Sequence, residues 1–134
     1  MKKIKSMAAE LKLSPKVIFT GFVDPKTLRN YYSACDIAVW VNNNSISTME
    51  AMACKRPVII PALQLKELAS YNNGYAFTPL NESDLIRCME KLVNDKDLRL
   101  KMGENGYKAI VKNFDYTKIA KDFLKIAEEI KIQK

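Results

Sequence analysis

The stretch DIAVWVNNNSISTMEAMACKRPVII, residues 36–60, decides the fold. Its two apolar runs, Ile37–Val41 and Val58–Ile60, have the length and β-branched content typical of buried strands. A polar loop, Asn42–Ser47, and a short helical segment, Thr48–Lys55, lie between them. Strand, polar loop, helix and strand in this order predict a βαβ unit.

The start of the central helix carries its own signal. Ser-Thr-Met-Glu, from Ser47 to Glu50, matches the capping-box pattern, in which the two side chains satisfy backbone amides. A polar loop that runs into a helix also presents free amides to an anion such as a phosphate. Capping alone and anion binding are both open interpretations of these residues.

The rest of the chain extends the pattern of strands and helices. Further strands are predicted at Val17–Thr20 and Tyr75–Thr78, and Asp24 followed by Pro25 predicts a helix start. Further helices are predicted near residues 1–13, 25–34, 66–70, 81–93, 96–112 and from 115 or 117 onward. We therefore expect one α/β domain over 1–134, a Rossmann-like parallel sheet of about four strands with helices on both faces.

Composition narrows the chemistry. The chain has 134 residues, 48% of them hydrophobic, and no apolar run of the roughly 18 residues that a membrane span needs. We expect a cytoplasmic protein. There is no histidine, and Cys35, Cys54 and Cys88 lack metal-ligand spacing, so we expect reduced, buried thiols and no metal site or catalytic triad.

The net charge of +7 has two interpretations. The first is an ordinary basic surface in contact with solvent. The second is a surface that binds phosphates, either those of a nucleotide or, in a peripheral contact, those of membrane lipids. The basic residues form no stripe interleaved with exposed aromatic residues, so we expect no nucleic-acid partner.

Several motifs, in order, resemble one enzyme family. The run from Glu50 to Ile59, E-A-M-A-C-x-x-P-V-I, is similar to the signature of the group 1 glycosyltransferases (family 4), which have the GT-B architecture. Weaker matches occur at Val17–Val23, Leu28–Asp36, Asn73–Tyr75 and Phe114–Tyr116. Together these matches cover nearly the whole chain.

The resemblance implies the C-terminal, donor-binding half of a GT-B fold, without its first two strands. It implies a hexosyltransferase that moves a sugar from a nucleoside-diphosphate sugar, its substrate and not a cofactor, to a saccharide or lipid-linked acceptor. The acceptor-binding N-terminal domain would be a partner outside these residues, so this piece alone is expected to be inactive.

The resemblance also implies roles for individual residues. Glu50 would hold the ribose, because a carboxylate accepts two O–H groups at once. The remaining candidates are the diphosphate binders Ser45, Ile46, Ser47 and Thr48, and the nucleobase contacts Gly21, Phe22 and Val23. Phe22 is alternatively a core residue, and Trp40 and the pair Tyr31-Tyr32 are expected to pack internally.

The chain departs from the family pattern at several positions. The family places a glutamate that touches the donor sugar at the position of Asn42, and glycines at those of Asn43 and Ser45. Asn42, Asn43 and Asn44 are donor-site candidates or only a turn, and Lys55 stands in place of a further glycine. The alternative function is therefore a degenerate, non-catalytic homologue that serves interaction or regulation. No catalytic residue is identified.

Overall fold

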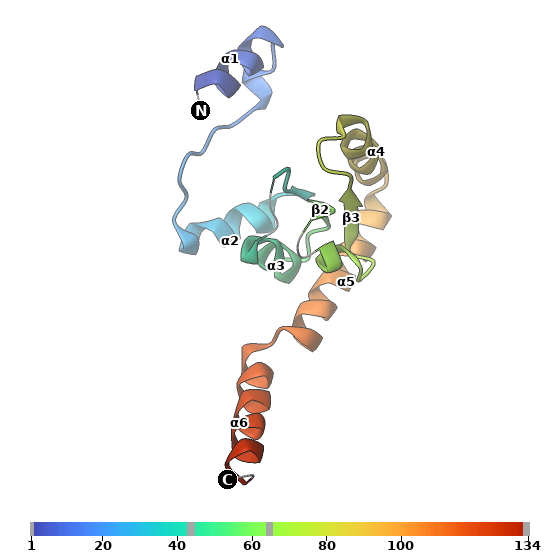
Figure 1. Cartoon of the computed structure of the whole chain (residues 1–134). Coiled ribbons are helices and arrows are strands. Elements are labelled where there is room, and N and C mark those ends of the chain that lie inside the picture. The colour runs from blue at the N-terminus through green and yellow to red at the C-terminus, as the bar shows by residue number, and fades with distance from the viewer. Residues whose placement is uncertain (1, 43–44, 64–65, 133–134) are drawn as a thin grey trace.

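The computed structural model describes residues 2–42, 45–63 and 66–132 (Figure 1). Within them, three parallel strands form one sheet in the order β1-β2-β3. The strands are β1 (Ala38–Val39), β2 (Val58–Pro61) and β3 (Gly74–Phe77). The helices and 3₁₀ turns are α1 (Lys2–Glu10), η1 (Ser14–Lys16), α2 (Pro25–Ala34), α3 (Ile46–Ala53), η2 (Lys66–Ala69), α4 (Glu82–Val93), α5 (Lys96–Asn113) and α6 (Tyr116–Ile132).

Strand β2 is the centre of the sheet. It pairs with β1 through Ala38 opposite Val58 and with β3 through Val58 opposite Gly74. All four of its residues are buried, as expected for a parallel strand covered on both faces. The prediction of an α/β fold with a parallel sheet and helices on both faces is confirmed.

Alternate residues of β2 feed two apolar clusters. Val58 and Ile60 pack with Met52 of α3 and Ala109 of α5 on one face of the sheet. On the other face, Ile59 joins a cluster whose helical members are Cys88, Leu92 and Met102, together with Phe77 of β3. The period-2 alternation of a strand thus fixes which helix covers which face.

The glycines of α5 allow it to lie close to α3. Gly103 and Gly106 are buried, and a Cβ on Gly103 would stand 2.1 Å from the carbonyl oxygen of Lys55, just after α3. Glycine inside a helix normally weakens it. The position of these two glycines shows instead that they permit a close helix–helix approach.

The predicted strand Val17–Thr20 is wrong for this structure. No strand forms there, and Ile18 is 88% exposed. A strand needs a neighbour to satisfy its amides and carbonyls, and the sheet begins at β1, away from this segment (Figure 1). Over the described residues the sheet therefore has three strands, where about four were expected. β1 likewise shrinks from the predicted Ile37–Val41 to two residues, because among those same residues it pairs with β2 on one side alone.

Helix boundaries are mostly as predicted. Asp24 caps α2 by accepting a hydrogen bond from the Lys26 amide at 2.8 Å. Asn81 and Asp115 accept comparable bonds at the starts of α4 and α6. The first backbone amides of a helix have no carbonyl partner, and short polar side chains in these positions accept hydrogen bonds from them.

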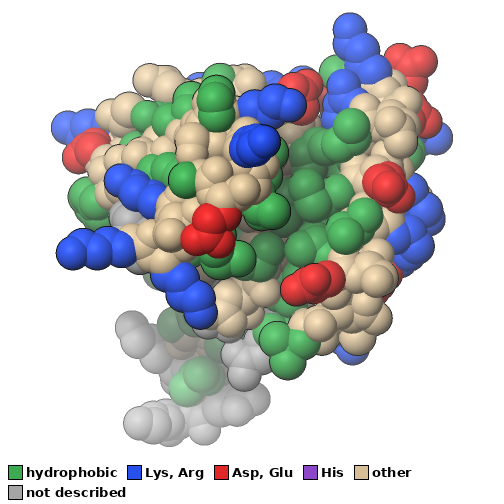
Figure 2. Space-filling model, turned by 90° about the horizontal axis from the view of Figure 1, so that it is seen from above, with side chains coloured by type: hydrophobic (Ala, Val, Ile, Leu, Met, Phe, Trp, Pro, Cys, Tyr) green, Lys and Arg blue, Asp and Glu red, His purple; other side chains and the backbone are tan. Residues whose placement is uncertain are grey.

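The two ends of the chain stand away from the packed centre (Figure 1). Helix α6 carries an apolar stripe at helical spacing, but its members Ile119, Phe123, Ile126 and Ile130 are exposed. Seen from above, hydrophobic side chains also gather in a hollow with charged groups around it (Figure 2). Much apolar surface is therefore uncovered, more than an isolated domain usually leaves exposed.

We predict that Gly103→Ala destabilises the fold by about 1–3 kcal/mol, because the new methyl group collides with backbone at Lys55. Helix propensity alone would give the opposite sign, a gain of up to about 1 kcal/mol. Urea unfolding followed by circular dichroism distinguishes the two. Val111→Ala, at an exposed position of the same helix, is the control. A stabilised Gly103→Ala variant would contradict the packing described above.

Asp84 links the end of β3 to α4. Its carboxylate accepts a hydrogen bond from the Thr78 amide at 2.7 Å and a second from Arg87. The Thr78 amide and then Arg87 lower the pKa of Asp84 from 3.8 to about 2. The stabilisation is therefore complete above pH 3.8 and is lost as the pH falls toward 2.

We accordingly predict that Asp84→Asn lowers the melting temperature at pH 7, where the wild-type carboxylate is charged. The variant should also lose less stability than the wild type between pH 4 and pH 2. Thermal melts across this range measure both effects, with Glu90→Gln on the exposed face of α4 as the control. Parallel pH profiles for Asp84→Asn and the wild type would contradict this role.

Candidate functional site

The βαβ unit places the start of α3 at the carboxyl end of β1. Ser45 is the N-cap residue, in extended conformation at φ −148°, and its side chain makes no capping hydrogen bond. The Thr48 amide donates to the Ser45 carbonyl at 2.9 Å. The amides of Ile46 and Ser47 have no acceptor within the helix. They give this end of α3 a partial positive charge directed toward the loop.

The predicted capping box is wrong. The helix starts at Ile46, two residues earlier than the predicted Thr48, so Glu50 lies beyond the first turn. The Glu50 side chain makes no hydrogen bond to the N-cap backbone among the described residues. Instead, Glu50 lines a cavity.

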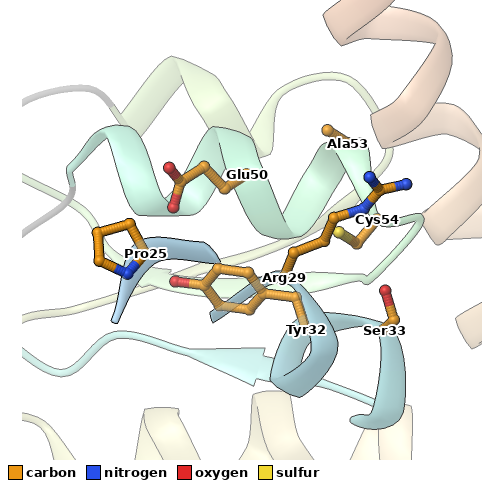
Figure 3. A pocket seen from close by; sticks show the side chains of 7 residues that line it. All are labelled: Pro25, Arg29, Tyr32, Ser33, Glu50, Ala53 and Cys54. Atoms are coloured by element: carbon orange, nitrogen blue, oxygen red, sulfur yellow. The ribbon is translucent and has the colours of Figure 1, made fainter. Parts of the chain in front are cut away.

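The cavity lies between α2 and α3 and has a volume of about 380 Å³. Its polar lining comes from Glu50 on α3 and from Arg29, Tyr32 and Ser33 on α2. Figure 3 shows the Glu50 carboxylate and the Tyr32 hydroxyl on the side of Pro25, while the Arg29 side chain extends toward Cys54. The cavity thus has an acidic end beside the start of α2 and a basic end near Cys54, at the C-terminal end of α3.

Ser47 joins three polar groups beside this cavity. Its Oγ accepts a hydrogen bond from the Trp40 indole Nε1 at 3.0 Å and lies 2.5 Å from the Ser45 Oγ. Burial raises the pKa of the Tyr32 phenol, an effect that a hydrogen bond with Ser47 partly offsets and that the charge of Glu50 increases. Ser47 is therefore a fixed part of the loop–helix junction.

Thr48 lies in the same helical turn and is fully buried. Its Oγ1 finds no hydrogen-bond partner among the residues that the structure describes. A buried hydroxyl without a hydrogen-bond partner is energetically costly. Because its side chain is buried, Thr48 could bind an anion only through backbone amides. The predicted diphosphate contact of Thr48 therefore cannot involve its hydroxyl.

The structure brings some predicted site residues together and leaves others apart. Ser45, Ile46 and Ser47 surround the start of α3, and Asn42 is exposed at the end of the strand before it. Asn43 and Asn44 lie outside the described residues. The predicted nucleobase contacts Gly21, Phe22 and Val23 lie in the segment before α2, next to Pro25 in the cavity wall. Phe22 is 94% exposed, so the alternative of a core position is wrong.

Other sequence expectations are corrected in detail. The three thiols are free, but only Cys88 is buried, while Cys35 and Cys54 are half-buried because they lie at the edges of α2 and α3. Burial raises the pKa of the Cys35 and Cys88 thiols. Lys55 pairs with Glu104 at 2.9 Å, a contact between α3 and α5 rather than a ligand site.

Two features are absent from the described residues. No group of three or more Cys, Asp or Glu side chains there is arranged to hold a metal ion. None of the helices in that part of the chain combines the length and apolarity that crossing a bilayer requires.

Sequence reasoning missed three residues of the site. Tyr32 and Trp40 pack against the core as predicted, but Tyr32 also lines the cavity and Trp40 also donates a hydrogen bond to Ser47. Arg29 was not considered. Its position one helical turn before Tyr32 and Ser33 was the available signal, because residues three and four apart share a helix face.

The model of the family "Glycosyl transferases group 1" matches residues 1–109. The chain belongs to this family. The other comparisons fit this assignment to the group 1 glycosyltransferases. Two uncharacterised glycosyltransferases of Methanocaldococcus jannaschii are each 25% identical to it, over 92% and 97% of the chain. The chain spans about a third of the length of these relatives, 33% and 34%.

Solved structures show the same fold. The C-terminal domain of a glycosyl transferase group 1 family protein from Francisella tularensis is 28% identical, with a TM-score of 0.75 over 85% of this chain and 62% of that one. Sucrose-phosphate synthase from Thermosynechococcus elongatus is 24% identical, with a TM-score of 0.83 over 99% of this chain and 35% of that one. TarM from S. aureus, in a complex that includes UDP, is 22% identical, with a TM-score of 0.81 over 92% of this chain and 26% of that one. This group 1 glycosyltransferase chain therefore has a partial Rossmann-like fold of the GT-B type.

We predict that Glu50→Ala changes the free energy of unfolding by less than about 0.5 kcal/mol, since this exposed carboxylate caps nothing. Chemical denaturation measures this value. Asn81→Ala, which removes the cap of α4, is the contrasting variant and should cost about 1 kcal/mol. A loss above 1 kcal/mol for Glu50→Ala would show that the side chain supports the fold and not a ligand.

Proposed function

We propose that this chain binds the nucleoside-diphosphate sugar donor of a hexosyltransferase. The observation that carries the proposal is the position of Glu50. Its carboxylate, about one turn after the start of α3, faces a cavity of about 380 Å³ between α2 and α3. A helix N-terminus favours a phosphate, and a carboxylate favours the hydroxyls of a sugar. The start of α3 and Glu50 therefore follow each other along the helix as the diphosphate and the ribose do in a nucleotide.

The proposed contacts follow the chemistry of the donor. Glu50 accepts hydrogen bonds from the two ribose hydroxyls, which are stronger than neutral ones because the acceptor is charged. The amides of Ile46 and Ser47 meet the diphosphate. When the glycosidic bond breaks, negative charge grows on the leaving diphosphate, and amides already aligned in a helix stabilise it without reorganisation. Gly21–Val23, before Pro25 in the cavity wall, would face the nucleobase.

The acceptor would bind outside the contacts described above. A saccharide or lipid-linked acceptor would be held by a second domain, outside these 134 residues. The relatives are about three times as long as the chain, which leaves room for such a domain. A solved structural neighbour, TarM, was crystallised with UDP, which supports a nucleotide donor in this fold. These residues alone are then expected to bind the donor without transferring its sugar.

We also propose that two further strands complete the sheet. β1 pairs with β2 on one edge, and beside β1 lies a groove of about 340 Å³ lined by Tyr31, Cys35, Val39 and Trp40 among others. In the doubly wound strand order 3-2-1-4-5-6, strands 1 and 2 stand between strands 3 and 4. With β1, β2 and β3 as strands 4, 5 and 6, the first of the two further strands would pair with the outer edge of β1.

A second function, a donor-domain homologue without catalysis, is favoured by one observation. Asn42 is exposed beside the start of α3, where the family has a glutamate. An amide side chain donates and accepts hydrogen bonds but brings no charge. Donor binding separates the two functions, because a degenerate domain has no reason to keep it.

We predict that UDP or GDP binds the wild-type chain and that Glu50→Ala weakens this binding by about 10- to 100-fold, the effect of losing hydrogen bonds to a charged group. Isothermal titration calorimetry at millimolar nucleotide measures both. Glu90→Ala, which removes an exposed carboxylate of α4, is the matched control and should bind like the wild type. No heat with either nucleotide, or equal affinities for Glu50→Ala and the wild type, would favour the non-catalytic function.

A further inference from the structure

Trp40, the single tryptophan of the chain, is fixed before the loop begins. Its amide donates to the Ile59 carbonyl at 2.9 Å, which extends the pairing of β1 with β2 by one residue. Its ring lies beside that of Tyr32, with centroids 6.4 Å apart and a tilt of 35°. The backbone and the ring together determine the direction of the indole N–H.

The indole N–H donates to the Ser47 Oγ at 3.0 Å. An indole nitrogen is only a donor, whereas a serine hydroxyl has one proton and two acceptor lone pairs. Ser47 must therefore accept the bond from Trp40, and its own proton is left for another acceptor. The Ser45 Oγ at 2.5 Å and the Tyr32 hydroxyl are the neighbours that take part in hydrogen bonds with it.

A phosphate at the start of α3 would compete for this proton. Hydrogen bonds to an ionised acceptor are roughly twice as strong as those between neutral groups. The Ser47 hydroxyl and the amides of Ile46 and Ser47 come from the same half-turn, so one anion can engage them together. Ser45, at the exposed N-cap, is free to turn away when the anion arrives.

We propose that Trp40 is a positioning residue for the donor diphosphate: its indole N–H holds Ser47 so that the serine donates its proton to a phosphate oxygen. This role rests on the function proposed above. It also accounts for a tryptophan at a strand end that is only half-buried. The sequence, which lacks the family glycines in this loop, would thus replace some of their backbone contacts by a hydroxyl.

The test follows the NMR signal of the Trp40 indole N–H. In the ¹⁵N-labelled full chain, one tryptophan gives one indole cross-peak in a ¹H–¹⁵N spectrum. The probes are UDP, uridine and inorganic pyrophosphate. UDP and pyrophosphate should move this peak, because each draws the Ser47 proton toward an anion, while uridine should leave it in place.

Three variants complete the experiment. Ser47→Ala should abolish the response to pyrophosphate and weaken UDP about tenfold. Ser47→Thr, which keeps the hydroxyl, should restore both. Trp40→Phe, which keeps a ring but loses the N–H, should weaken UDP about threefold and leave uridine unchanged. In the Ser47→Ala background, Trp40→Phe should have no further effect on UDP.

The outcomes separate this role from the proposed function. If UDP binds and Glu50→Ala weakens it, but Trp40→Phe binds UDP as the wild type does, the positioning role is wrong and donor binding stands. Equal losses for UDP and uridine in Trp40→Phe would show general damage to packing and would also overturn it. If UDP and pyrophosphate move no resonance of the wild type, both proposals fail.

Discussion

The pairing of β1 with β2 is the constraint from which the site follows. Only two residue pairs define it, Ala38 with Val58 and Val39 with Ile59, but β2 is buried on both faces and cannot shift without exposing its apolar side chains. Since α3 connects the two strands, their register fixes where α3 begins. The free amides at that point, the Ser47 hydroxyl and the Glu50 carboxylate therefore occupy set positions on one helix, and Glu50 lines the cavity between α2 and α3.

The close approach of α5 reinforces this arrangement from behind. Gly103 and Gly106 let α5 lie against the end of α3, and Lys55 and Glu104 form an ion pair across the contact. The pair is exposed and is expected to contribute little. The packing of Met52 and Ala109 under the sheet contributes more, because both are well buried in the same cluster. α3 is thus held against α5, while its face that carries Glu50 and Ala53 lines the cavity on the side of α2.

How far the sequence predicted this structure depended on the range of the interaction. Asp24 capping α2, and the buried strand after Pro57, follow from short-range chemistry and were correct. Val17–Thr20 has the composition of a strand, but a strand is defined by a partner, and none lies beside it here. The capping box failed because α3 begins two residues earlier than predicted, which places Ser47 inside the helix, where its hydroxyl accepts a hydrogen bond from Trp40. Arg29 and Tyr32 became site residues only through the packing of α2 on α3, which no local pattern encodes.

The central claim is that a nucleotide lies with its diphosphate on the start of α3 and its ribose on Glu50. A crystal structure of the chain soaked with UDP or GDP tests this most directly. We expect phosphate density within hydrogen-bond distance of the Ile46 and Ser47 amides. We also expect a ribose whose hydroxyls donate hydrogen bonds to the Glu50 carboxylate. A nucleotide bound elsewhere on the chain, with the space beside Glu50 filled only by water, would contradict it.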